Sequence, residues 1–315
     1  MTGNNEPPIR PADASAVAAA AALLRSGGLV AVPTETVYGL AARADSDAAV
    51  AAIYRAKGRP DFNPLIVHVA DLAAAERLAW FDDRALRLAA AFWPGALTMV
   101  LPRRDDAPLA AAVSAGLPTV ALRCPAHPAM RALLVAAELP LAAPSANRSG
   151  AVSPTSAAHV AASLGNRVDL ILDGGKCDSG IESTIVALRE SGGWQLLRPG
   201  PITEREISAV LGGAAETTVP LGIEAPGQLA SHYAPGKPVR LDALTPASDE
   251  FHIGFGEIGG DFNLSPSGDL AQAAAQLYAA LHRGAASSLA RIAVAPIPEE
   301  GIGTAINDRL RRAAA

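Results

Sequence analysis

Short runs of leucine and β-branched residues alternate with helical patterns along most of this 315-residue chain, and this alternation constrains the fold most strongly. The runs predict strands at 29–33, 65–69, 96–101, 119–123, 139–144, 168–173, 183–188 and 194–200. The segments between them predict helices at 13–25, 46–56, 71–91, 128–138 and 153–165. Strands and helices mixed at this density predict an α/β fold built on a sheet of several strands.

The composition of the chain changes after Gly212, which indicates a second domain. Residues 213–238 contain four prolines and little periodicity, as is typical of a linker. Beyond them, strands near 239–242, 251–255 and 291–295 and helices at 269–282 and 304–312 predict a smaller α/β unit. We therefore expect a polar N-terminal tail (1–8), a first domain (9–212), a linker (213–238) and a C-terminal domain (239–315).

The composition also excludes several classes of protein. Two cysteines, Cys124 and Cys177, are too few for a disulfide framework or a cysteine-rich metal site. The N-terminal residues are polar and no long uncharged apolar run occurs, so we expect a cytoplasmic protein with no membrane partner. The net charge of −5 argues against a protein that coats nucleic acid.

Standard catalytic motifs are missing or lie in the wrong context. The sequence GFGEIG at 254–259 matches a dinucleotide-binding pattern, but no helix is expected before about Ser267 or Asp269. The six histidines show no metal-ligand spacing, and no G-x-S-x-G nucleophile motif occurs. We therefore expect no covalent catalyst and no metal held by protein side chains.

Polar segments follow the ends of several predicted strands, where ligands bind in open α/β sheets. They are PTETVYG (33–39), KGRPDFNPL (57–65), Arg123, APSANRSG (143–150), Ser153 at a predicted helix start, GIEST (180–184) and Arg198. Singly, they also fit simpler interpretations: charge at a helix end for Lys57, a solvated Arg123, a plain turn at 143–150 and a capping role for Ser153. Together they predict a concave site that carries cations and hydroxyls and suits a nucleotide and a small carboxylate.

The ordered motifs of the chain resemble the threonylcarbamoyl-AMP synthase family, in its long form with a YrdC-like domain and an added C-terminal domain. The matching segments are PTETVYGLAA, KGRPDFNPLIVHV, FWPGALTMVL, TVALRCPAHP, PLAAPSANRSGAVSPT, LDGGKCDSGIESTIV, LLRPGPIT, SHYAP and IAVAPIPEEGIGTAINDRLRRAA. Ala41, Ala96 and Lys176 depart from residues common in the family. The resemblance implies a mixed, twisted YrdC-like sheet with flanking helices and a Rossmann-like α/β C-terminal domain.

The resemblance also implies an activity. Members of the family are nucleotidyltransferases that condense L-threonine, bicarbonate or CO2, and ATP into threonylcarbamoyl-AMP and release pyrophosphate. The product supplies the machinery that transfers threonylcarbamoyl to tRNA, and the acidic charge of this chain argues against direct contact with tRNA. Mg²⁺ is expected on the ATP phosphates, with much of its water shell retained.

Site residues carry over from the family pattern to matching positions of this sequence. Catalytic positions are Lys57, Arg59, Ser145 and Asn147, a K-x-R…S-x-N signature. ATP-contacting positions are Arg59, Asn63, Thr119, Ser145, Ser153 and Arg198. Threonine-side positions are Thr36, His68, Arg123, the Ala143 backbone and Ser183.

We expect the linker to act as a lid, because an SHYAP segment interrupts its otherwise featureless sequence. His232 or Tyr233 would then touch the nucleotide and help to exclude water from the reactive adenylate. Two alternatives to the synthase activity remain at this point. One is an RNA-binding translation or regulatory protein, and the other is a carbamoyltransferase that forms carbamoyl adenylate.

Overall fold

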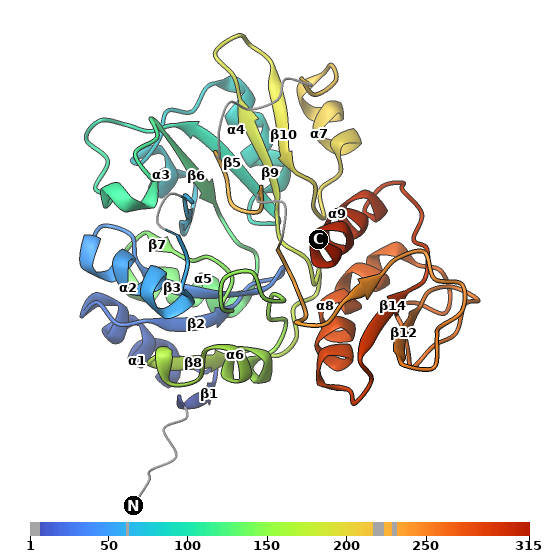
Figure 1. Cartoon of the computed structure of the whole chain (residues 1–315). Helices are drawn as coiled ribbons and strands as arrows, with labels where there is room; N and C mark the ends of the chain where they lie inside the picture. The colour runs from blue at the N-terminus through green and yellow to red at the C-terminus, as the bar shows by residue number, and fades with distance from the viewer. Residues whose placement is uncertain (1–6, 61–62, 217–223, 229–231) are drawn as a thin grey trace, which may run out of the picture.

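The computed structural model describes residues 7–60, 63–216, 224–228 and 232–315, which form two α/β units (Figure 1). The described residues of the larger unit build a mixed ten-stranded sheet in the order β1-β8-β2-β3-β7-β4-β6-β5-β9-β10. Its strands are β1 (Ile9–Pro11), β2 (Val30–Pro33), β3 (Tyr38–Arg43), β4 (Ile66–His68), β5 (Leu97–Pro102), β6 (Thr119–Arg123), β7 (Leu141–Ala142), β8 (Leu170–Asp173), β9 (Thr184–Leu188) and β10 (Trp194–Arg198).

Helices flank this sheet. They are α1 (Ala14–Arg25), α2 (Asp47–Lys57), α3 (Leu72–Glu76), α4 (Asp83–Phe92), α5 (Pro128–Ala137), α6 (Ala157–Leu164) and α7 (Glu204–Leu211). Separate apolar clusters, one around Leu40, Ile53 and Leu97 and one around Leu24 and Leu133, bury the strands beneath them. The α/β fold with a mixed sheet, expected from the sequence, is confirmed.

The smaller unit is a parallel sheet of β11 (Val239–Arg240), β14 (Arg291–Val294), β12 (Glu250–Gly254) and β13 (Phe262–Asn263), in that order. Helices α8 (Leu270–Ala286) and α9 (Gly303–Ala314) lie between this sheet and the larger unit (Figure 1). The segment GFGEIG begins at Gly254, the last residue of β12, and continues as a loop, and Asp269 caps α8 well beyond it. The expectation that these glycines do not start a helix is therefore confirmed.

Two predicted helices are wrong and one strand was not predicted, each for a local physical reason. Residues 71–91 form α3 and α4 rather than one helix, because Asp82 caps a new helix with its carboxylate on the Ala85 amide. The helix expected from Ser153 begins instead at Ala157, with Ser156 as its cap. The strand β3 was not predicted, and it forms a hairpin with β2 in which Pro33 pairs with Tyr38.

One helix was missed by the sequence reasoning. Helix α7 begins with a capping box, in which Thr203 and Glu206 each bind the other's backbone N–H. The T-x-x-E pattern at 203–206 is the signal that would have indicated it.

The two units share an apolar interface. Val37, Val152 and Ile181 of the first unit pack in the same cluster as Leu277 and Ile306 of the second. At Gly180 the chain passes so close to α8 that a Cβ atom there would lie 2.4 Å from the Ala275 Cα atom. The residue also has φ +69°, which only glycine adopts readily.

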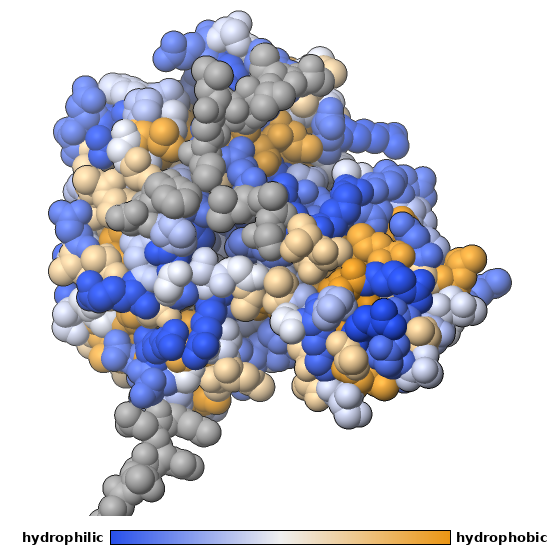
Figure 2. All heavy atoms as spheres, viewed as in Figure 1, coloured by the Kyte–Doolittle hydropathy of each residue, from blue (hydrophilic) through white to orange (hydrophobic). Residues whose placement is uncertain are grey.

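The surface of the molecule mixes residues of both kinds: Figure 2 shows hydrophilic and hydrophobic residues interspersed over the face seen in Figure 1. Among the helices that the described residues form, none has the length and apolarity needed to cross a membrane.

Candidate active site

A cavity lies over one face of the large sheet, and four residues of the linker help to line it. Ile66 and His68 of β4 both line it, and residues two apart on a strand share a face. Ile66 and Ala121 on this face pack against Ala225 of the linker, which therefore covers part of the sheet beside the cavity. The remaining lining residues are Thr34, Thr36, Val37, Gly39, Arg59, Arg123, Ala143, Pro144, Ser145, Glu182, Ser183, Arg198, Pro226, Gly227, His232 and Tyr233. The site thus uses a sheet face as well as the strand ends that the sequence indicated.

Lys57 holds the loop that follows β7. Its buried ammonium donates hydrogen bonds to the carbonyl oxygens of Ser145 and Asn147, the latter at 2.6 Å. The amide of Ser149 also donates to the Lys57 carbonyl at 2.9 Å. Burial and the nearby Arg59 charge lower the pKa of Lys57. The K-x-R…S-x-N signature is therefore one structural unit, in which Lys57 shapes the loop and Arg59 and Ser145 reach the cavity.

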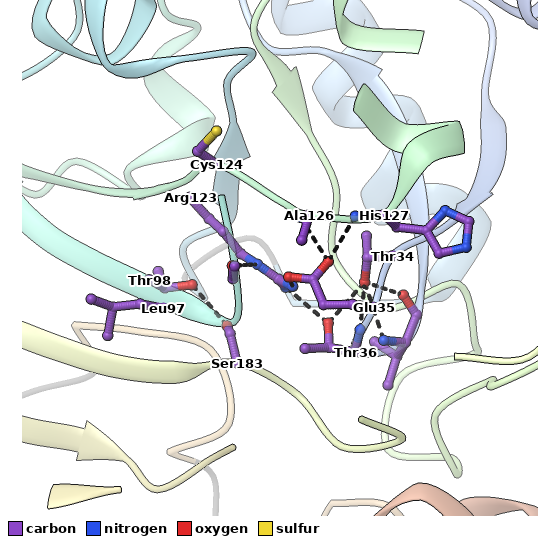
Figure 3. A network of polar contacts seen from close by, with 12 residues as sticks. Thr34, Glu35, Thr36, Leu97, Thr98, Arg123, Cys124, Ala126, His127 and Ser183 are labelled. Carbon is purple, nitrogen blue, oxygen red and sulfur yellow. Dashed lines mark hydrogen bonds and ion pairs between the residues drawn. The ribbon is translucent and has the colours of Figure 1, made fainter. Parts of the chain in front are cut away.

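Arg123 ends β6 and projects into the cavity, where its guanidinium has three partners (Figure 3). It donates to the Gly95 carbonyl at 3.1 Å, to Thr36 Oγ1 at 2.9 Å and to Glu35 Oε1 at 2.7 Å. The pairing of β4 with β6 aligns His68 with Arg123, so both side chains lie at one end of these strands. Because guanidinium carries five N–H donors, Arg123 keeps donors for a further acceptor such as a carboxylate.

Arg198, at the end of β10, binds Ser183 in the adjoining part of the cavity. Its Nε and Nη2 donate to the Ser183 carbonyl and Oγ at 3.0 and 3.1 Å. The same Ser183 Oγ lies 2.7 Å from Thr98 Oγ1 (Figure 3). A third bond, 3.3 Å long, joins Arg198 Nη1 to the Pro226 carbonyl of the linker. Arg198 thereby ties the strand, the GIEST segment and the linker together.

Buried polar atoms without a hydrogen-bond partner gather around this cavity. Of six such side-chain atoms among the described residues, five belong to residues assigned here by the sequence: Arg59 Nε, Asn63 Oδ1, His68 Nδ1, Asn147 Oδ1 and His232 Nδ1. Burial lowers the pKa of His68 and of His232 to about 3, so both rings are neutral at physiological pH. Three of these five residues, Arg59, His68 and His232, line the cavity, and because unpartnered buried polar atoms are costly, they indicate a binding site for a polar ligand.

The linker segment His232–Tyr233 reaches the cavity from the side of the C-terminal unit. The Tyr233 ring packs 4.1 Å from His232 and 5.6 Å from Tyr278 of α8, between ring centres. Its backbone has φ +64°, a strained value for a bulky residue. The next amide, Ala234 N, donates to the Gly150 carbonyl at 2.8 Å. Other parts of the proposed lid, 217–223 and 229–231, lie outside the described residues.

The structure thus brings most of the predicted site residues together. Ten of them line the cavity: Thr36, Arg59, His68, Arg123, Ala143, Ser145, Ser183, Arg198, His232 and Tyr233. Lys57 and Asn147 lie behind them in the loop contacts already described. Thr119 shares the face of β6 with Arg123 but lies four residues away, which is about 13 Å along a strand.

Ser153 does not have the local role that its sequence context suggested. Its Oγ donates to Glu182 Oε1 at 2.6 Å rather than capping a helix, since α6 starts three residues after the expected position. Glu35 and Glu182 are the two acidic residues at this site that the sequence reasoning did not single out. Glu182 lies within the GIEST segment and Glu35 within PTETVYG, so the segments were recognised but not their acidic residues.

The sequence was compared with known proteins. A family model described as telomere recombination, which groups Sua5, YciO and YrdC, matches residues 22–200. A second, described as the C-terminal domain of threonylcarbamoyl-AMP synthase, matches residues 202–315. Threonylcarbamoyl-AMP synthase of Bacillus subtilis is 41% identical over 95% of this chain and 92% of its own length. The Pyrococcus abyssi protein of that name is 39% identical over 93% and 92%.

Solved structures agree with this result. The crystal structure of P. abyssi Sua5 complexed with L-threonine matches with a TM-score of 0.87 and 35% identity, over 98% of this chain and 97% of that one. A P. abyssi Sua5 variant with two alanine substitutions gives 0.85 and 36%, over 95% and 92%. Since the two family models together match residues 22–200 and 202–315, and the relatives align over more than nine tenths of the chain, the chain belongs to the Sua5 branch of the threonylcarbamoyl-AMP synthase family.

Proposed function

We propose that this protein condenses L-threonine, bicarbonate or CO2, and ATP into threonylcarbamoyl-AMP, with release of pyrophosphate. The observation that supports this most strongly is the cavity itself, which Arg59, Arg123 and Arg198 line together with His68 and His232, whose Nδ1 atoms are buried and unpartnered. All the substrates except CO2 carry anionic groups, and guanidinium groups bind carboxylates and phosphates well. The relatives named for the same synthesis, and the relative solved with threonine, agree with this assignment.

Arg123 is the cation best placed for the threonine carboxylate. It shares its end of the sheet with His68, and its contact with Thr36 Oγ1 fixes one guanidinium nitrogen. Thr36 and Ser183 bring hydroxyls to the same cavity, so they can bind the substrate hydroxyl and favour threonine over valine. The neutral His68 ring leaves its Nδ1 atom free to accept or donate, depending on its tautomer.

ATP would occupy the part of the cavity bounded by Arg59, Ser145 and Arg198. Burial lowers the pKa of Arg59 only to about 10, so this guanidinium stays charged and can bind a phosphate. The threonine amine takes up CO2 to form a carbamate, whose oxygen attacks the α-phosphorus as pyrophosphate leaves. No protein nucleophile takes part, and catalysis depends on alignment and on stabilisation of negative charge.

Mg²⁺ would enter on the ATP phosphates. Within the described residues, no group of three His, Cys, Asp or Glu side chains is arranged to hold a metal ion. The two carboxylates at the site, Glu35 and Glu182, each bind an arginine. When bound, the ion would neutralise phosphate charge, and the cationic side chains described above complement that arrangement.

His232 and Tyr233 would limit the access of water to the adenylate. Their rings already line the cavity, and the hydrogen bond from Ala234 to Gly150 anchors the segment. We further propose that the product passes to the machinery that transfers threonylcarbamoyl to tRNA, with no direct tRNA contact by this chain.

Pyrophosphate release provides the direct test. The protein is incubated with ATP, Mg²⁺, bicarbonate and threonine, and with each mixture that lacks one substrate. We expect pyrophosphate and threonylcarbamoyl-AMP only from the complete mixture. Pyrophosphate release that does not depend on threonine or bicarbonate would reject this function.

A further inference from the structure

Glu182 is a buried carboxylate at the junction of the two domains. Its Oε1 accepts a hydrogen bond from Ser153 at 2.6 Å, and its Oε2 accepts one from Tyr278 of α8 at 2.8 Å. The same Oε2 accepts a bond from Arg309 Nε of α9 at 2.9 Å. Two of these three donors come from the C-terminal domain.

Arg309 lies behind Glu182 as seen from the cavity. Its side chain is fully buried, and it does not line the cavity, whereas Glu182 does. A second bond, from Arg309 Nη1 to Asp308 at 2.8 Å, fixes the guanidinium on α9. The guanidinium also lies 5.5 Å from the centre of the Tyr233 ring, within the range of a cation–π contact. Arg309 therefore contacts both Glu182, which lines the cavity, and Tyr233 of the linker.

A carboxylate at this position conflicts with the chemistry proposed for the site. The cavity must bind phosphates, and Glu182 is next in the chain to Ser183, which Arg198 binds. An uncompensated Glu182 would repel an anionic ligand and attract Arg198, since unscreened buried charges interact strongly. Some group must therefore balance its charge.

We propose that Arg309 is a positioning residue through which the C-terminal domain completes the ATP site. It holds the Glu182 carboxylate in an ion pair at the domain junction, so that Arg198 stays available to the phosphates. This inference rests on the proposed function, and it assigns to the C-terminal domain a role in substrate affinity.

The charged surroundings of Glu182 agree with this role. Burial alone would raise the pKa of Glu182, but Arg309 and then Arg198 lower it to about 2. Charged and titratable groups from both domains and the linker interact with Glu182. They are Arg309 on α9, with Asp308 beside that arginine, Tyr278 on α8, Arg198 on β10, Lys57 on α2, and His232 and Tyr233 of the linker. Removal of Arg309 takes away the largest stabilising contribution to the ionised form, so the pKa of Glu182 rises.

The test compares ATP affinity in Arg309→Met, in Arg309→Met with Glu182→Gln, and in the wild type. ATP binding is measured by calorimetry and the KM for ATP by pyrophosphate release, between about pH 8 and about pH 6. We expect Arg309→Met to weaken ATP binding about tenfold at the higher pH, with a smaller change in kcat. The loss of ATP affinity in Arg309→Met should become smaller as the pH falls, because Glu182 then takes up a proton. Adding Glu182→Gln should restore most of the affinity and remove the pH dependence.

A matched control separates this effect from a general loss at α9. Arg311 is on the same helix and forms an exposed ion pair with Glu299, so Arg311→Met should leave ATP affinity unchanged. If Arg309→Met does not fold, Tyr278→Phe removes one donor from Glu182 and keeps the ring. It should weaken ATP binding about threefold, again less at lower pH.

Unchanged ATP affinity in Arg309→Met, or in Tyr278→Phe where that variant replaces it, would overturn the inference. So would a loss that neither low pH nor Glu182→Gln relieves, because this would mean that Arg309 only docks the domains. Failure of the proposed function is distinguishable. It would show as wild-type protein that forms no threonylcarbamoyl-AMP, while the calorimetric comparison still measures the effect of Arg309 on ATP.

Discussion

Two buried arginine–carboxylate pairs flank the cavity, and they face it in opposite ways. In the pair Arg123–Glu35, the arginine lines the cavity and the carboxylate does not. In the pair Arg309–Glu182, the carboxylate lines the cavity and the arginine lies behind it. We therefore expect the first pair to orient a cation toward an anionic substrate, and the second to neutralise a carboxylate that would otherwise repel that substrate.

The two pairs also differ in where their partners come from. Arg123 and Glu35 both belong to the large domain, and Glu35 Oε2 also accepts from the backbone amide of Ala126 at 3.1 Å (Figure 3). Arg309 and Glu182 belong to different domains, so their pairing depends on domain docking. If the proposed assignments hold, the threonine end of the site is complete within one domain, and the ATP end depends on both.

Removal of Arg123 should have the largest effect on function. Arg123→Ala leaves the threonine carboxylate without its cation, which we expect to cost about 2–5 kcal/mol of threonine binding. This corresponds to a rise of about 30-fold or more in the KM for threonine, measured by pyrophosphate release, with ATP affinity nearly unchanged. Arg131→Ala, on α5 and outside the cavity, is the matched control and should retain the wild-type KM. An unchanged threonine KM in Arg123→Ala would mean that Arg123 does not bind the substrate, so that the two pairs would no longer differ in the way proposed.

The pair Arg309–Glu182 should dominate the dependence of stability on acid. The pKa of Glu182 falls from 4.5 to about 2 on folding, so its contribution is complete above pH 4.5 and is lost as the pH falls toward about 2. The linked free energy is on the order of 3 kcal/mol. Denaturant unfolding of Glu182→Gln should therefore lose stability less steeply than the wild type between about pH 5 and about pH 3. Parallel curves for the two proteins would show that the ion pair does not carry this dependence.

Loss of the carboxylate behind Arg123 should have a moderate effect. Burial alone would raise the pKa of Glu35, but Arg123 holds it below the usual value, so Glu35 is ionised at neutral pH. Glu35→Gln weakens its hydrogen bonds to Arg123 and to the Ala126 amide, and we expect about a threefold to tenfold rise in the threonine KM. A change in ATP affinity of the same size would contradict the assignment of this pair to the threonine end.

The smallest expected effect is on the pH dependence of the threonine KM. The pKa of His68 is lowered to about 3 by burial and by the Arg123 charge, so this ring does not titrate near neutrality. The threonine KM should show no step near pH 6.5 that disappears in His68→Gln. A step in the threonine KM near pH 6.5 that His68→Gln abolishes would contradict this prediction, because it would mean that a group beside Arg123 titrates there.

The elements that local pattern specifies were predictable. The buried strands β2, β4, β5, β6, β8, β9 and β10 match apolar runs, and α2 and α5 match their helical periods. The predictions were wrong where a competing signal decides the local structure. Asp82 divides the segment 71–91, and the turn at Thr34–Val37 starts a hairpin, with Thr34 Oγ1 donating to the Val37 carbonyl at 2.7 Å.

The candidate site likewise has features that the sequence predicted and features that it did not. Family motifs identified the residues that line the cavity, because short segments such as GIEST and APSANRSG are recognisable by themselves. Which of their atoms contact one another was not predictable. Glu35 pairs with a residue 88 positions away and Glu182 with one 127 positions away.

The sequence alone therefore determined the family, the α/β class and the set of polar segments that contribute to the site. Only the tertiary structure decided that Lys57 shapes a loop, that Ser153 binds Glu182, and that one arginine lines the cavity while another lies behind a carboxylate. The physical reason is that local pattern specifies strands and helices through neighbouring residues. The environment of a buried charge instead depends on sheet register and domain docking, which bring distant parts of the chain together.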